Sequence, residues 1–214
     1  MSDKQIPLEL KHTPSYAMVD FIVSSSNSEA YGLLDGHGDW PGHVAAVVGP
    51  EACGKSHLVR AWGAEHCAQF IQPGDDVATI PARSMIVLDN ADDNAVPEEW
   101  LFHLYNWVKE VGGKLVLTSR ENPTRWQVSL PDLRSRLATV TIGKIAEPDD
   151  MLITALLVKL FSDRQLQVDM AVIDYILPRL ERSFAAVHSF VEQVDASALA
   201  SQRKITKALV KNCF

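Results

Sequence analysis

The residues with the clearest chemical pattern lie between Gly49 and Ser56. This segment reads GPEACGKS and matches the P-loop pattern G-x-x-x-x-G-K-[ST] at every fixed position. In a P-loop, backbone N–H groups surround the phosphates of a nucleotide, the lysine contacts the β- and γ-phosphates, and the final hydroxyl is a ligand of Mg²⁺. The segment therefore predicts a site for ADP or ATP with Mg²⁺. Its expected contacts are Gly49, Pro50, Ala52, Cys53, Gly54, Lys55, Ser56 and His57.

A second candidate group follows the apolar run from Met85 to Leu88. Asp89 comes next, and a carboxylate at the end of a neighbouring strand is what a P-loop protein uses to hold the magnesium shell. A turn or helix cap is the alternative role. Asn90 follows where many hydrolytic P-loop proteins have glutamate, and its amide can orient a water but cannot accept the proton. Asp92 is nearby, but its register does not match the strand end. We take Asp89 and Asn90 as catalytic candidates and expect slow hydrolysis by the isolated chain.

Polar residues also follow the next apolar run, Lys114–Thr118. The stretch Thr118–Asn122 is polar or charged throughout, and it ends a strand predicted to lie beside the strand that carries Asp89. One of its side chains could sense the γ-phosphate, and Ser119 is our first candidate. Ordinary loop polarity explains the cluster equally well.

Two arginines, Arg134 and Arg136, lie in the short segment Leu133–Leu137. Residues two apart on a helix point in different directions, so at most one of them can face a given target. An arginine at a domain edge can stabilise phosphate charge in a neighbouring subunit, as an arginine finger acting in trans. A solvated helix surface is the alternative.

Strand and helix patterns alternate from residue 13 to residue 147. Continuously apolar runs separated by helical segments predict a parallel sheet with helices on both faces, so the fold class is α/β with five strands. The expected strands are Val44–Val48, Gln69–Ile71, Met85–Leu88, Lys114–Thr118 and Thr139–Ile142. The expected helices are one capped by Ser26 or Asn27 and ending near Gly36, followed by Lys55–Cys67, Glu98–Val111 and Leu133–Leu137.

The strand pattern disappears between residues 148 and 214. Helices are expected at 149–164, 169–181, 183–199 and 204–212, with no strand between them. This segment is therefore predicted to be a small, separate all-α domain. Residues 1–12 are predicted to be a short N-terminal tail, in which Pro7 disfavours a helix.

Charge and cysteine content argue against several classes of function. The 214 residues carry a formal charge of −7 and no basic block, so direct DNA binding is not expected. The three cysteines match no zinc pattern, and a reduced, cytoplasmic protein is expected. No apolar run approaches the roughly 20 residues of a membrane helix, and the N-terminus does not resemble a signal peptide. Cys53 is either a small residue in a tight loop or a reactive thiolate near a helix N-terminus.

The order of these motifs resembles that of AAA+ ATPases, and among them the DnaA-related regulators of replication initiation of the Hda type. The resemblance extends over essentially the whole chain and implies an AAA+ nucleotide-binding domain over residues 13–147 and a helical lid over residues 148–214. The segments that carry it are Gly49–Ser56, Asp89, Ser119, Leu133–Leu137 and the helical C-terminal segment.

The tail and one helical segment extend the resemblance to partner proteins. Gln5–Leu10 is similar to the clamp-binding hexapeptide of the family, which would place it on the β subunit, the sliding clamp of DNA polymerase. Leu130–Leu137 is similar to the box that carries the arginine finger, which implies that Arg136 completes the ATP site of DnaA. The residues implied to contact the clamp are Gln5, Ile6, Leu8 and Leu10.

Two further parts of the resemblance concern the nucleotide. Glu181–Phe184 and Ser201–Thr206 resemble the lid of the family, which makes Arg182 the sensor-two arginine that contacts the nucleotide. Asn27 and the stretch Phe21–Val23 would lie beside the adenine base.

The resemblance implies a regulator that binds ADP or ATP, docks on the clamp and promotes hydrolysis of DnaA-bound ATP, and so inhibits initiation of replication. Nucleotide state could then control self-association into a homo-oligomer. Two other functions share the P-loop. A small-molecule kinase would need an acceptor site and a basic lid. A helicase loader of AAA+ build would need a basic groove for single-stranded nucleic acid, which the negative charge disfavours.

The tail generates a direct test. A variant that carries Gln5→Ala and Leu8→Ala should lose binding to purified sliding clamp in a pull-down assay, because it removes a hydrogen-bonding side chain and an apolar anchor of the hexapeptide. Its nucleotide affinity should not change. Clamp binding that survives deletion of residues 1–12 would remove the tail from the interaction.

Overall fold

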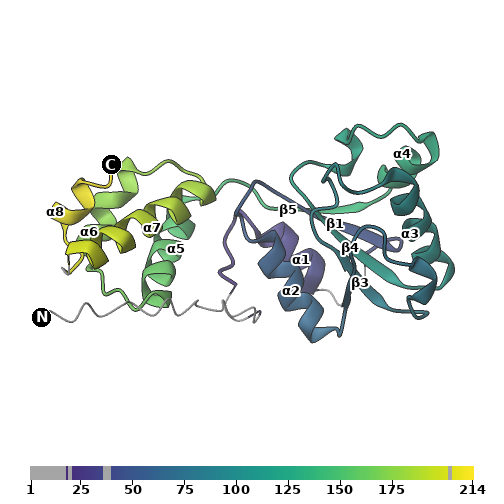
Figure 1. The fold of residues 1–214 in the computed structure, drawn as a ribbon, viewed down its shortest axis with the longest axis horizontal. Coiled ribbons are helices and arrows are strands. Elements are labelled where there is room, and N and C mark those ends of the chain that lie inside the picture. The colour runs from purple at the N-terminus through teal and green to yellow at the C-terminus, as the bar shows by residue number, and fades with distance from the viewer. Residues whose placement is uncertain (1–17, 19–20, 36–39, 202–203) are drawn as a thin grey trace, which may run out of the picture.

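The computed structural model describes residues 18, 21–35, 40–201 and 204–214. Figure 1 shows two parts, an α/β part that contains the sheet and an all-helical part that contains the C-terminus. The change occurs between the last strand, β5 (Thr141–Lys144), and helix α5 (Asp150–Asp163).

The sheet has five parallel strands in the order β2-β3-β4-β1-β5. This confirms the expected five-stranded parallel sheet. Because the strands are parallel, the carboxyl ends of β1, β3 and β4 lie at the same edge of the sheet. The first four strands are β1 (Val44–Val48), β2 (Gln69–Phe70), β3 (Met85–Leu88) and β4 (Lys114–Ser119).

Helices cover both faces of the sheet, which is why its central strands are apolar without interruption. Alternate residues of β1 face opposite sides: Ala45 and Val47 pack under α1 and α2, whereas Ala46 and Val48 pack under α3 and α4. Figure 1 shows these two helix layers on either side of the sheet. The helices are α1 (Ser28–Asp35), α2 (Lys55–Glu65), α3 (Glu98–Glu110) and α4 (Pro131–Leu137), and short 3₁₀ helices cover Val77–Thr79 and Pro123–Arg125.

The last strand begins two residues later than the sequence pattern predicts. The expected bounds 139–142 were wrong, because Thr139 and Val140 belong to the turn that ends α4. Their N–H groups donate to the carbonyl oxygens of Arg136 and Leu137, at 3.0 and 3.3 Å. Val140 is apolar and buried, so its hydrophobicity resembles that of a strand residue although its backbone is in a turn.

The C-terminal part contains α5, α6 (Met170–Ile176), α7 (Phe184–Ser201) and α8 (Lys207–Lys211). The helix expected at 169–181 ends early, and a 3₁₀ helix over Leu177–Arg179 follows α6. Pro178 accounts for this change, because proline has no N–H to continue an α-helix. The helix expected at 204–212 begins only at Lys207, after Thr206, whose hydroxyl caps its first turn.

The helical part is attached to the α/β part by both polar and apolar contacts. Asp149 accepts a hydrogen bond from Leu152 N, which caps α5, and another from the Ser25 hydroxyl, each at 2.7 Å. These hydrogen bonds hold the pKa of Asp149 below its ordinary value. Leu152 and Phe184 are also buried in the same apolar cluster as Leu58 of α2. The contacts place the start of α7 close to the P-loop.

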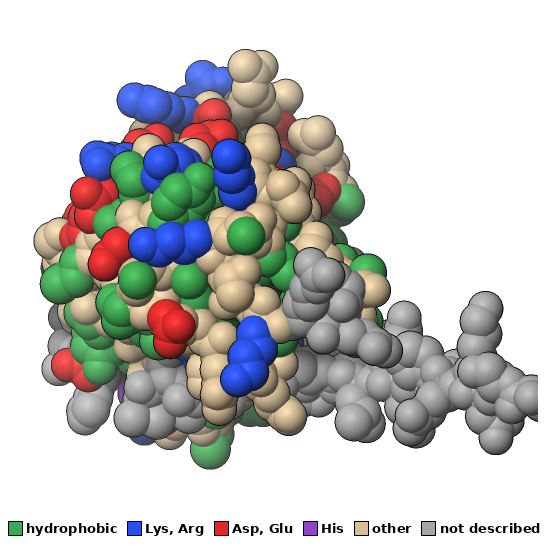
Figure 2. Space-filling model, turned by 90° about the vertical axis from the view of Figure 1, so that its left-hand side faces the viewer, with side chains coloured by type: hydrophobic (Ala, Val, Ile, Leu, Met, Phe, Trp, Pro, Cys, Tyr) green, Lys and Arg blue, Asp and Glu red, His purple; other side chains and the backbone are tan. Residues whose placement is uncertain are grey.

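The face of the helical part shown in Figure 2 carries lysine and arginine side chains interspersed with acidic and hydrophobic ones. This face therefore presents charges of both signs. Within the described ranges, no helix has the length and apolar composition needed to cross a membrane.

Two glycines test the packing of α1 against β5. A Cβ atom on Gly143 would lie 2.8 Å from both Ala30 Cα and Leu33 Cδ2, whereas a Cβ on Gly32 would meet no atom within 4 Å. Gly143→Ala should therefore lower the free energy of unfolding by about 1–3 kcal/mol. Gly32→Ala, in the interior of α1, should raise it by about 0.5–1 kcal/mol. Urea unfolding of the two variants measures both effects, and equal effects of the two would contradict the described packing.

Candidate functional site

The segment 49–56 forms a tight loop between β1 and α2. A Cβ atom on Gly49 would lie 2.8 Å from the Ile145 carbonyl oxygen and 2.9 Å from Cys53 Sγ, so only glycine fits there. Gly54 has φ +93°, in the left-handed region that glycine adopts without strain, and no side chain caps the helix that follows it. The first N–H groups of α2 are thus available to an anion, as in a phosphate-binding loop.

Lys55 lies inside this loop and is only 6% exposed. Its ammonium group donates to the carbonyl oxygens of Gly49 and Pro50, at 2.8 and 2.7 Å. The buried charge is therefore balanced by backbone dipoles of the loop itself. A phosphate would offer the same ammonium charged acceptors, with which hydrogen bonds are stronger.

Ser56 and Asp89, the two predicted magnesium ligands, are in direct contact. The Ser56 hydroxyl donates to Asp89 Oδ1 at 3.0 Å, and the Thr118 hydroxyl donates to the same oxygen. One hydroxyl and one carboxylate at the carboxyl edge of the sheet are oxygen ligands of the kind that Mg²⁺ prefers. These residues therefore fit a magnesium ion shared with a nucleotide.

Asn90 lies on the same cavity and has a left-handed backbone, with φ +56°. Asparagine adopts this region more readily than most residues that have a Cβ atom. The Asn90 N–H donates to the Thr118 hydroxyl at 2.8 Å, so the conformation is held by the neighbouring strand. Its amide can orient a water molecule but cannot remove a proton.

The P-loop cavity has a volume of about 530 Å³ and three walls. Residues 51–57 form the first, and His188 of α7 contributes from the helical part. The opposite wall contains Asn90, Asp92, Asp93 and Arg120. The cavity thus brings together the loop, the end of β3 and the helical part, with charges of both signs.

Asp92 is engaged with the segment that leaves β4. Its Oδ2 accepts from the N–H groups of Arg120 and Glu121, at 2.8 and 3.4 Å, and lies 3.9 Å from the Arg120 Nε. We predicted no catalytic role for Asp92, and these contacts indicate a structural one. Arg120 is the cationic residue on this wall that sequence reasoning did not single out.

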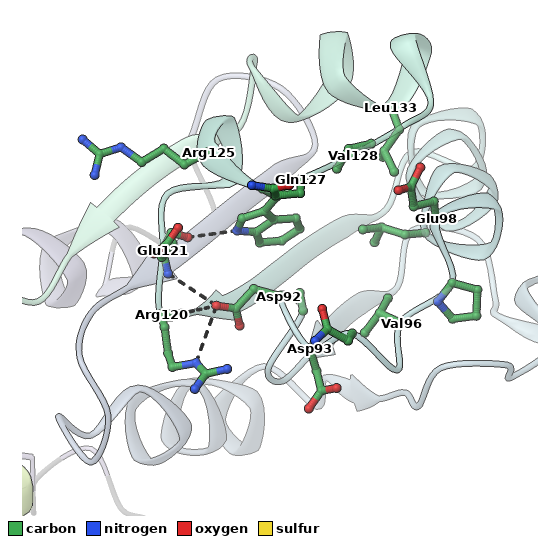
Figure 3. A pocket seen from close by; sticks show the side chains of 15 residues that line it. Asp92, Asp93, Val96, Glu98, Arg120, Glu121, Arg125, Gln127, Val128 and Leu133 are labelled. Atoms are coloured by element: carbon green, nitrogen blue, oxygen red, sulfur yellow. Dashed lines mark hydrogen bonds and ion pairs between the residues drawn. The ribbon is translucent and has the colours of Figure 1, made fainter.

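A second cavity of about 670 Å³ adjoins the first, and Asp92 and Arg120 line both. Figure 3 shows the hydrogen bonds between Asp92 and the 120–121 segment. Val96, Val128 and Leu133 line the apolar part of the same cavity. Asp92 and Arg120 therefore lie at the boundary between the P-loop cavity and this second, partly apolar cavity.

The structure places two of the predicted nucleotide-contacting residues away from the P-loop cavity. Ser119 is fully buried, and its hydroxyl donates to the Glu121 carbonyl oxygen at 2.8 Å, so it does not face the P-loop cavity. Strand alternation explains this, since Thr118 and Ser119 point to opposite faces and Thr118 is the one that meets Asp89. Arg182 is exposed and ion-paired with Asp150 at 3.0 Å, and it does not line the cavity.

Of the helical residues that the structure describes, His188 is the one that lines the cavity. Sequence reasoning missed it, although a signal was present. Phe184 is an apolar anchor of α7, and a residue four positions later lies on the same face of a helix. Phe184 packs against the α/β part, so His188, on the same face of α7, also faces the α/β part.

The residues predicted to lie beside the base shape the loop before α1. The Asn27 side chain is buried, donates to the Ile22 carbonyl oxygen and accepts from Ser24 N, each at 2.8 Å. Asn27 therefore holds the backbone of this segment. The Phe21 ring lies edge-on to His57, with ring centroids 5.7 Å apart, on the flank of the P-loop.

The two arginines of α4 point in different directions, as helical spacing predicts. Arg134 donates to the Val128 carbonyl oxygen, whereas the Arg136 guanidinium lies 5.8 Å from the centre of the Tyr105 ring. Within the described part of the chain, neither arginine lines the P-loop cavity. Arg136 is thus not directed at the nucleotide site of its own chain.

The predicted clamp-binding tail lies outside the described residues. Gln5, Ile6, Leu8 and Leu10 all belong to the segment 1–17, and their role stays a prediction from sequence.

A parallel α/β sheet with a P-loop after β1 and a helical lid after β5 is the architecture of AAA+ proteins. Residues 149–214 match the family model described as Hda, lid domain. The C-terminal part is therefore similar to the lid of Hda, and the fold comparisons below show that the whole chain has the fold of DnaA domain III.

Comparison with solved structures gives the same fold. Domain III of the replication initiation protein DnaA from Thermotoga maritima superposes with a TM-score of 0.77 at 15% identity, covering 94% of this chain and 96% of that domain. AMPPCP-bound DnaA from Aquifex aeolicus gives 0.67 at 18% identity, covering 89% and 68%. The Holliday junction branch migration motor RuvB from Thermotoga maritima gives 0.68 at 16% identity, covering 93% and 71%.

Cys53 lies within the loop, and its two possible roles can be separated by labelling. Burial raises the pKa of the Cys53 thiol above its ordinary value, and the Lys55 ammonium, 3.9 Å away, only partly opposes this. At pH 7.5 iodoacetamide should therefore modify the exposed Cys67 first and Cys53 last, as peptide mass spectrometry would show. Urea-unfolded protein, in which all three cysteines react, provides the control. Preferential labelling of Cys53 would mean that the Lys55 charge lowers the pKa of its thiol by more than burial raises it.

Proposed function

We propose that the chain binds ADP or ATP together with Mg²⁺ in the P-loop cavity. The uncapped start of α2 and the Lys55 ammonium would bind the phosphates, and Ser56 and Asp89 would hold the metal shell. The solved DnaA structures with AMPPCP support this, because they contain a nucleotide analogue on the same fold.

The isolated chain should hydrolyse ATP slowly. Asn90 occupies the position after the metal-shell carboxylate and has no basic group, and Asp92 is engaged with the backbone beyond β4. The functional proposal rests on one observation: the P-loop is complete, but the amide of Asn90 stands where a general base would be. It favours a protein that uses its bound nucleotide as a regulatory ligand.

Arg136 would then act on another protein. It lies on α4 outside the cavity of its own chain, with its guanidinium beside Tyr105. In a mixed complex it would supply positive charge to the γ-phosphate of DnaA-bound ATP and so stabilise the transition state of hydrolysis. The DnaA–ADP that results is the inactive form implied by the family resemblance, and the chain would thereby inhibit initiation of replication.

The tail would bring the chain to replicating DNA by binding the sliding clamp through Gln5–Leu10. This part of the proposal rests on sequence alone, as do the cytoplasmic location and a possible homo-oligomer. The negative charge, −7 in total, supports contact with proteins rather than with bare DNA.

The alternatives differ in what they require of the lid. A small-molecule kinase needs basic lid residues over the transferred phosphate. In the described lid the residue on the cavity is a histidine, while Arg182 pairs with Asp150. A phosphorylated product from a nucleoside panel would support the kinase instead.

The decisive experiment measures hydrolysis of ATP bound to purified DnaA in the presence of clamp-loaded DNA. The wild-type chain should accelerate hydrolysis, and Arg136→Ala should return the rate to that of DnaA alone, since an arginine finger contributes roughly 10³-fold or more. Arg179→Ala, which removes an exposed arginine of the lid, is the matched control and should act like the wild type. Full stimulation by Arg136→Ala would exclude the finger, and no stimulation by any form would refute the regulatory function.

A further inference from the structure

His188 is held over the P-loop by the packing of α7. Ser183 caps this helix, with its hydroxyl accepting from Ala186 N at 3.1 Å, and Phe184 is buried with Leu152 and Leu58. One turn later, the half-buried imidazole of His188 lines the cavity that Lys55 also lines. The buried Phe184 and the Ser183 cap therefore fix the start of α7, and with it the position of His188.

Groups of both signs surround this imidazole. In the lid, Arg164 at the end of α5 and Glu192 on α7 act on it from opposite directions. The other charged or titratable side chains that line the cavity are Glu51, Cys53, Lys55, His57, Asp92, Asp93 and Arg120. Burial is the main cause that lowers the pKa of His188 below its ordinary value, and the positive charge of Arg164 lowers it further. The negative charge of Glu192 only partly opposes these two effects. At neutral pH the imidazole is thus uncharged in the protein without nucleotide.

The arginine that the family resemblance places at the nucleotide is occupied elsewhere. Arg182 Nη2 lies 3.0 and 3.1 Å from the two carboxylate oxygens of Asp150, in the first turn of α5. Both partners lie within the lid, so the pair stabilises the lid itself. Among the described residues of the lid, His188 is the one that lines the cavity.

We propose that His188 contacts the phosphates of the bound nucleotide and does so as the charged imidazolium, so that nucleotide binding is coupled to uptake of a proton. This inference rests on the proposed nucleotide binding and identifies the lid residue that takes part in it. A protonated imidazole donates from both ring nitrogens and is a suitable partner for a polyphosphate.

The direction of the pH dependence follows from linkage. Phosphate anions beside the imidazole stabilise its charged form, so its pKa is higher in the complex than in the free protein. Binding takes up a proton between these two pKa values, and the affinity rises as the pH falls through that window. Above the pKa of the complex, His188 adds no pH dependence.

The test is calorimetric titration of the whole protein with Mg·ADP at pH 6.5 and pH 8, in buffers of different ionisation enthalpy. The dependence of the heat on the buffer reports proton uptake directly. Because the terminal phosphate of the nucleotide titrates in the same range, the informative quantity is the difference between the wild type and His188→Gln. His103→Gln, which replaces an exposed histidine of α3, is the matched control.

His188→Gln should bind Mg·ADP about tenfold more weakly at pH 6.5 and nearly as well as the wild type at pH 8, and it should take up fewer protons. His188→Lys, which keeps a positive charge throughout this range, should bind Mg·ADP at both pH values about as tightly as the wild type binds it at pH 6.5, so that the pH dependence is lost. A purely structural histidine would not be rescued in this way.

Two results would overturn the inference, and they differ. If the wild type and His188→Gln bind with the same affinity and proton uptake while Lys55→Ala loses binding, the nucleotide site stands but His188 does not contact it. If the wild type binds no nucleotide, the proposed function fails and the inference fails with it.

Discussion

A single carboxylate oxygen joins the elements on which the candidate site depends. Asp89 Oδ1 accepts hydrogen bonds from Ser56 of α2 and from Thr118 of β4, while Asp89 itself directly follows β3. Two strands and one helix therefore meet at the carboxyl edge of the sheet, and the Asn90 N–H joins the same cluster by donating to Thr118. The order of the strands makes this contact possible, because β4 lies between β1 and β3 and brings the P-loop and the Asp89 carboxylate to one edge of the sheet.

The lid is attached close to the same edge of the sheet. The apolar anchors Leu152 and Phe184 bury the lid against α2, and Asp149 fixes the start of α5 to the segment before α1. The lid is thus attached on the side of the sheet that carries the phosphate loop. Its contribution to the cavity follows from that attachment, since α7 begins beside the loop and directs its second turn toward it.

Much of the fold was predictable because the relevant signals are local and strong. The P-loop spacing, the uninterrupted apolar strands and the change to helices after β5 each depend on short stretches of sequence. The misplaced start of β5 has a different origin, since Val140 is buried in a turn and hydrophobicity alone does not distinguish this from a strand.

The side chains of the site were harder to assign than its backbone. Thr118 and Ser119 are both polar and adjacent, and only the pleat of β4 decides which one meets Asp89. Arg182 and His188 are both on the lid, and the choice between them depends on Asp150, thirty-two residues away, which pairs with the arginine. A family pattern predicts which segment lies near a ligand, but the tertiary partners decide which side chain reaches it.

The two carbonyl contacts of Lys55 balance its buried charge within the loop. Because Gly49 and Pro50 offer acceptors to the ammonium group, departure of a ligand does not leave a buried charge unpaired. The ammonium group thus has two acceptors that belong to the loop itself. Under the proposed function, one nucleotide could replace another without leaving this buried charge unpaired.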